Sequence, residues 1–130
     1  MPEVDPKALV IRFRPMEPES LIKRAALDAR RSEGGHHAVS VWCGVQEEGE
    51  TESELRDRIL DITVQNGLGA ANNNRYWVCT TALELMERGF KFVKDGYDGE
   101  PEAHFSVILG DPPTLEDAKR FVEPFERMER

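Results

Sequence analysis

Three histidines carry the most chemically useful side chains in this sequence, and each lies at the start of a predicted strand. His104 and Ser106 fall on one face of the strand predicted over 104–109, because side chains alternate along a strand. An imidazole and a hydroxyl two residues apart can together hold one phosphate oxygen, and an imidazole exchanges a proton near neutral pH. The pair is therefore a candidate for acid–base chemistry on a phosphate ester.

The run His104-Phe-Ser-Val107 resembles one half of the signature of the 2H phosphoesterases, in which a histidine precedes Ser or Thr by two residues. That family uses the signature twice. The second candidate half is His36-His37-Ala-Val-Ser40, which departs from the pattern because its histidines precede Ser40 by four and three residues. Alternation places His36 on the face of Ser40 and His37 on the opposite face. The resemblance covers about ten residues, and it implies a phosphodiesterase site if His36 or His37 meets His104 in one cleft. The other interpretation is that all three histidines are ordinary polar ends of strands.

Arginines on predicted strands form a second candidate group. Arg12, Arg14 and Arg75 could together bind an anion, since a guanidinium contacts phosphate or carboxylate through two parallel hydrogen bonds. The alternative is salt bridging to acidic side chains, because Asp and Glu outnumber Lys and Arg by 25 to 17. Surface ion pairs of that kind are common and individually weak.

The charge balance limits the classes of partner. The 130-residue chain has a net charge of −8 and an isoelectric point of about 4.9. Nucleic-acid binders normally carry a basic face, so this balance argues against a nucleic-acid partner. Excess acid keeps a protein in solution, and it also steers a basic partner toward it. A basic protein partner is therefore compatible with the sequence, beside the plainer interpretation of solubility.

Familiar cofactor and metal motifs are missing from the sequence. It contains no glycine-rich phosphate loop ending in Lys-Ser or Lys-Thr, no Gly-x-Gly-x-x-Gly, no His-Glu-x-x-His and no paired-cysteine motif. We therefore expect no cofactor and no metal. The two cysteines, Cys43 and Cys79, lie in apolar runs and are predicted to be buried thiols. The chain shows neither a signal-peptide pattern nor an apolar run long enough to cross a bilayer, which predicts a cytoplasmic protein.

The order of predicted elements indicates one α+β domain over residues 1–130, with fraying ends at 1–7 and 127–130. Period-two patterns predict strands over 8–14, 36–45, 75–80, 90–94 and 104–109. An apolar stripe predicts a helix over 20–31, and Thr-x-x-Glu or Thr-x-x-Asp capping patterns begin helices at Thr51, Thr81 and Thr114. We predict a two-layer sandwich: a mixed sheet of about five strands with the helices mainly on one face.

Two functions fit this sequence. The first is a small acidic intracellular protein that binds another protein, of the immunity, antitoxin or defence-accessory type. The second is a small phosphoesterase or ribonuclease-like enzyme in which His104 and Ser106 act with His36 or His37. The distance between His37 and His104 separates the two, because a shared phosphate requires about 5–7 Å between the imidazoles. The missing catalytic motifs favour the binding protein.

Overall fold

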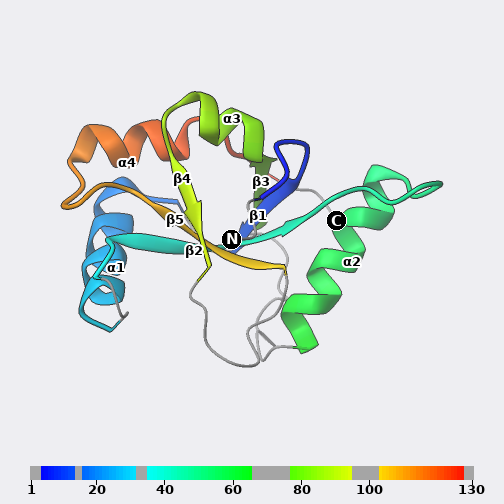
Figure 1. Ribbon diagram of the computed structural model, residues 1–130, viewed down its shortest axis with the longest axis horizontal. Helices are drawn as coiled ribbons and strands as arrows, with labels where there is room; N and C mark the ends of the chain where they lie inside the picture. The colour runs from blue at the N-terminus through cyan, green and yellow to red at the C-terminus, as the bar shows by residue number, and fades with distance from the viewer. Residues whose placement is uncertain (1–3, 14–15, 32–34, 66–76, 95–102, 128–130) are drawn as a thin grey trace.

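A computed structural model describes residues 4–13, 16–31, 35–65, 77–94 and 103–127 (Figure 1). Strands and helices alternate along most of this part of the chain, which confirms the predicted α+β class. The elements are β1 (Leu9–Phe13), α1 (Pro18–Arg31), β2 (Ala38–Gly44), α2 (Glu52–Gln65), β3 (Trp77–Thr81), α3 (Ala82–Glu87), β4 (Lys91–Val93), β5 (His104–Ile108), α4 (Leu115–Val122) and β6 (Glu126–Arg127).

The strands form one sheet in the order β4-β5-β2-β1-β3-β6, and every described pair is antiparallel. The prediction of a mixed sheet is therefore wrong. Helix α1 joins the neighbouring strands β1 and β2, yet these run antiparallel, so the chain leaves and re-enters the sheet at the same end. A strand–helix–strand order is compatible with a second strand that runs either parallel or antiparallel to the first. The five predicted strands correspond to β1–β5, while β6 has only two residues and is too short for a period-two pattern.

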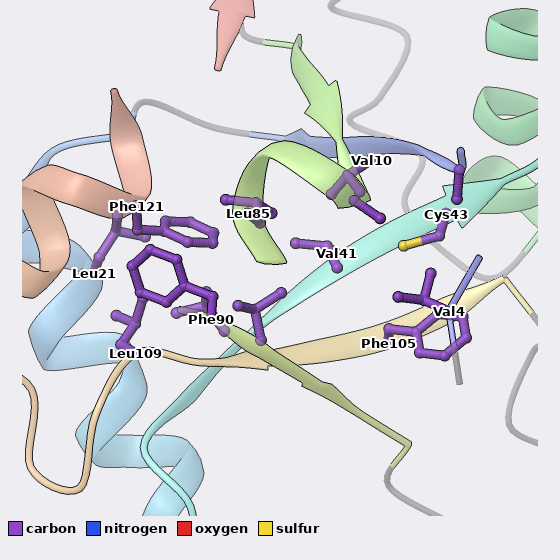
Figure 2. Close-up of a cluster of buried hydrophobic side chains, with 14 of the residues drawn as sticks. Val4, Val10, Leu21, Val41, Cys43, Leu85, Phe90, Phe105, Leu109 and Phe121 are labelled. Atoms are coloured by element: carbon purple, nitrogen blue, oxygen red, sulfur yellow. The ribbon is translucent and has the colours of Figure 1, made fainter. Parts of the chain in front are cut away.

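One face of the sheet is covered by α1, α3 and α4 (Figure 1). The odd-numbered residues of β2 and β5 point to this face and pack against the three helices, as the prediction of helices mainly on one face requires. Figure 2 shows Phe121, Leu21, Phe90 and Leu109 meeting at one end of this core, where the rings of Phe90 and Phe121 lie 5.5 Å apart edge to face. Val4 also packs into this core, although it belongs to a segment predicted to fray.

The opposite face of the sheet is covered by α2, which overturns the prediction of two layers. Leu55, Ile59 and Leu60 of α2 pack on Trp42 and Trp77 in a second buried cluster. Strand β2 ends at Gly44, where a side chain would bring a Cβ within 2.9 Å of the Ile59 Cδ1 atom. Glycine therefore permits the close approach of α2 to the sheet. Where α2 lies, the domain has three layers.

The three helix starts predicted from threonine capping patterns are confirmed by their caps. The hydroxyls of Thr51 and Thr114 each accept a hydrogen bond from the backbone N–H three residues later, and the N–H of each threonine in turn donates to the acidic side chain of that later residue. Thr81 caps α3 in the same way through its hydroxyl. Helix α1 begins at Pro18, two residues before the predicted start. Proline suits a first helical turn because its fixed φ fits the helix and no hydrogen-bond partner is needed there.

Candidate functional site

Two of the three candidate histidines lie beside the loop that joins β5 to α4. His36 and His37 precede β2 rather than starting it, and both contact Asp111. The His36 Nδ1 atom lies 3.2 Å from one Asp111 carboxylate oxygen, and the His37 backbone N–H donates to the other at 2.9 Å. The His37 carbonyl also accepts from the backbone of Leu109 at 2.9 Å. The pair thus continues the β2–β5 ladder by one hydrogen bond and fixes the loop that follows.

Hydrogen bonding keeps Asp111 ionised. The backbone N–H of His37 and the side chain of His36 lower the pKa of this carboxyl below its ordinary value. The carboxylate is about half exposed to solvent, so its contacts with the two imidazoles are ordinary surface interactions, which contribute little each. Among the residues that the structure describes, no group of three or more His, Cys, Asp or Glu side chains could hold a metal ion.

The third histidine, His104, begins β5 and lies opposite Trp42 of β2. Their rings are 5.0 Å apart and inclined at 56°. Ser106 shares the strand face of His104, as predicted, but it lies within the sheet, paired with Ser40 of β2 on one side and Val93 of the edge strand β4 on the other. Its residue exposure is only 5%. The Ser106 hydroxyl is therefore not open to a phosphate in solvent.

The strand register separates His104 from the other two histidines. Leu109, whose backbone bonds to His37, lies five residues beyond His104 along the chain. At roughly 3.3 Å per strand residue this corresponds to about 16 Å. Bridging one phosphate requires about 5–7 Å. The condition that the enzyme alternative sets, with His36 or His37 and His104 in one cleft, finds no support in the β2–β5 register, which places these histidines toward opposite ends of the paired strands. The catalytic roles of His36, His37, His104 and Ser106 stay predictions.

The predicted arginine group is described only in part. Arg12 lies in β1, and its Nη1 donates to the carbonyl of Ser40 at 2.5 Å. The side chain is partly buried and lies on the face of Val10, which packs under the helices. Arg12 therefore links β1 to β2 by a side-chain hydrogen bond on the sheet face that α1, α3 and α4 cover. Arg14 and Arg75 lie outside the described residues, so their part in an anion site stays a prediction.

Both cysteines are buried, as predicted, with free thiols. Cys43 of β2 packs in the core under α1, α3 and α4, whereas Cys79 of β3 packs in the cluster under α2. Strand β1 lies between β2 and β3 in the sheet. Because the two thiols lie on opposite faces and on non-adjacent strands, they are not placed to form a disulfide with each other. Burial raises the pKa of Cys43 to about 12 and also raises that of Cys79.

The strongest concentration of charge lies on the outer side of α2 and on the loop before it. Residues 46–65 contain seven acidic and two basic side chains, a net charge of −5 out of −8 for the whole chain. We call this the acidic surface; its carboxylates belong to Glu47, Glu48, Glu50, Glu52, Glu54, Asp57 and Asp61. All but Glu50 are exposed residues. The inner side of α2 is apolar and packs on the sheet, so the carboxylates are left facing outward.

Arg58 holds the loop of the acidic surface against α2. Its Nε and Nη2 donate to the two carboxylate oxygens of Glu50, both at 2.9 Å, and Nη2 also donates to the carbonyl of Val45 at 2.8 Å. The side chain of Gln46 donates to the carbonyl of Glu50, and the backbone of Glu47 donates to the Glu50 carboxylate. The hydrogen bonds from Arg58 lower the pKa of Glu50 from 4.5 to about 2. The loop is therefore fixed, and Glu50 stays ionised at any physiological pH.

A shallow hollow lies along the acidic surface, where the loop meets α2. Its volume is about 450 Å³, and it is lined by Glu50, Glu54, Asp57, Arg58, Asp61, Ile62 and Gln65. The spacing of three and four residues puts these α2 side chains in one stripe along the helix. In the sequence this stripe is recognisable only by its acidic residues. Nothing distinguishes Arg58, which holds the loop against α2, from the other Lys and Arg residues among the 17 in the chain.

No protein-family model matches the sequence, and no curated protein or solved structure compared with the chain matches it. Of the helices in the described ranges, none is both long and apolar enough to cross a bilayer.

Proposed function

We propose that the protein is a non-catalytic interaction protein, and that its acidic surface binds a partner protein through a basic surface. The observation that carries this proposal is the gathering of most of the net charge on one side of α2. Like charges close together repel one another, so such a gathering costs stability unless an opposite charge neutralises it. A basic partner supplies that opposite charge.

The fixed geometry of the acidic surface supports the same proposal. Arg58 holds the Glu47–Glu50 turn, and Arg56 pairs with Glu52 at 2.8 Å. A surface that is already ordered loses less conformational entropy when a partner binds. Its field also raises the rate of encounter with a basic partner, and this effect weakens as salt screens it. The proposal thus predicts fast, salt-sensitive association.

The position of the histidines gives the enzyme alternative no comparable support. That alternative needs two imidazoles at one phosphate, whereas β2–β5 pairing separates His37 from His104 by about 16 Å. Ser106, whose hydroxyl would hold a phosphate oxygen together with His104, is buried in the sheet. We therefore propose binding rather than turnover, of the kind by which small proteins inhibit, escort or scaffold another protein.

The test is a comparative capture with two charge variants. The first carries Glu48→Lys, Asp57→Lys and Asp61→Lys on the acidic surface. The second carries three Glu→Lys changes at exposed positions in or near the other helices, Glu17, Glu87 and Glu116. Each variant changes the net charge from −8 to −2, so the two match in net charge and differ in where three charges are reversed. Circular dichroism and thermal melting verify that both fold.

Wild-type protein and both variants are immobilised and exposed to extract from the native host, and bound proteins are identified by mass spectrometry. We expect a partner with a basic surface to bind the wild type and the Glu17/Glu87/Glu116 variant but not the acidic-surface variant. The purified partner must then reproduce this pattern in a two-component binding measurement. A purified partner that binds all three proteins equally would overturn the proposal, as would one whose contact surface proves acidic.

A further inference from the structure

We draw no further inference here: the strongest candidate, the side-chain cluster of His36, His37 and Asp111 between the start of β2 and the loop from β5 to α4, has its polar atoms turned toward one another, and nothing in the structure shows what ligand it would take.

Discussion

Cysteine reactivity in this protein is set by where each thiol lies in the sheet. Cys43 and Cys79 come from strands that flank β1, but they point to opposite faces and into different clusters of buried side chains. Only the thiolate is a good nucleophile, and burial in apolar surroundings disfavours it. The sequence already indicates this burial, because both cysteines lie in apolar strand patterns. Predicting that the two thiols are separated requires the strand order, and local sequence patterns do not give that order.

Both thiols should therefore resist a thiol reagent in the native state. With the pKa of Cys43 raised to about 12 and that of Cys79 also raised, we expect negligible reaction with 5,5′-dithiobis(2-nitrobenzoate) at neutral pH in native buffer. In denaturant both cysteines should react, since the thiols then recover ordinary pKa values. Absorbance at the reagent's thiolate band measures the number of thiols. Rapid reaction of either cysteine in native buffer would show that the strand carrying it is not in the core.

Glu50 gives the acidic surface a definite pH dependence. Its pKa is lowered to about 2 by Arg58, whereas the unfolded chain has the ordinary value of 4.5. A lowered pKa contributes stability that is complete above the unfolded value and is lost as pH falls toward the folded one. We therefore expect the melting temperature of the wild type to exceed that of Glu50→Gln above about pH 4.5. The difference should shrink steadily toward pH 2.

The matched control for this titration is Glu52→Gln, which removes a carboxylate from the same surface. Glu52 is 62% exposed and pairs with Arg56 within one helix, so its loss should move the melting temperature much less. Equal effects of Glu50→Gln and Glu52→Gln at every pH would contradict the anchoring role of Arg58. A direct measurement of the Glu50 carboxyl by NMR titration gives its pKa, and Arg58→Ala should return it toward 4.5.

Helix starts are the elements that sequence patterns predict best here. Thr51, Thr81 and Thr114 each stand at the N-cap, because a hydroxyl that accepts a backbone N–H is a local interaction that does not depend on the rest of the fold. Strand positions of β1–β5 are also close to the predicted ranges, since each has an apolar face in alternation. These features are readable because they are encoded within a few neighbouring residues.

Strand direction and the second helical layer could not be predicted in the same way. The antiparallel return from β1 to β2 depends on how α1 packs across the sheet, and that packing involves residues far apart in sequence. Placement of α2 on the opposite face depends on a buried cluster that includes Trp42 of β2 and Trp77 of β3. These two strands flank β1 in the sheet. The separation of His37 from His104 has the same origin. The register between β2 and β5, which are distant in sequence but paired in the sheet, fixes this separation. Residue spacing within either strand does not predict it.

Removing the cap of α2 should destabilise the protein measurably. We expect Thr51→Ala to lower the free energy of unfolding by about 0.5–2 kcal/mol, because the N–H of Glu54 loses its acceptor. Urea denaturation followed by circular dichroism measures this value. Ser53→Ala, two residues away on the exposed side of the same helix, is the control and should change it by less than about 0.5 kcal/mol. A larger loss for Ser53→Ala than for Thr51→Ala would contradict the observed helix start.

Strand β2 lies near the centre of the sheet and carries side chains for both clusters. Val41 is fully buried (Figure 2), so Val41→Ala should cost about 1–3 kcal/mol through lost burial and a small cavity. Val45, just beyond the same strand, is 41% exposed and serves as the control. Its change to Ala should cost less than about 0.5 kcal/mol. Similar losses from both changes would show that β2 is not central to the core.

The whole molecule combines an apolar, two-sided sheet with a strongly uneven distribution of charge. Three helices cover one face, and α2 alone among the described helices covers the other (Figure 1). That helix and the loop before it carry −5 of the total charge of −8. Among the described elements, α2 and the loop before it thus carry most of the net charge, which favours oriented encounter with the basic partner that we propose.

The association rate constant of the identified partner, measured at several ionic strengths, tests the proposed function most directly. For wild type we expect it to fall at least about tenfold as ionic strength rises from roughly 0.05 to 0.5 M, because salt screens the acidic surface. The Glu48→Lys/Asp57→Lys/Asp61→Lys variant should associate slowly and lose this salt dependence. The Glu17→Lys/Glu87→Lys/Glu116→Lys variant, with the same net charge, should keep most of the wild-type rate. Equal rates and equal salt dependence for all three proteins would contradict the account.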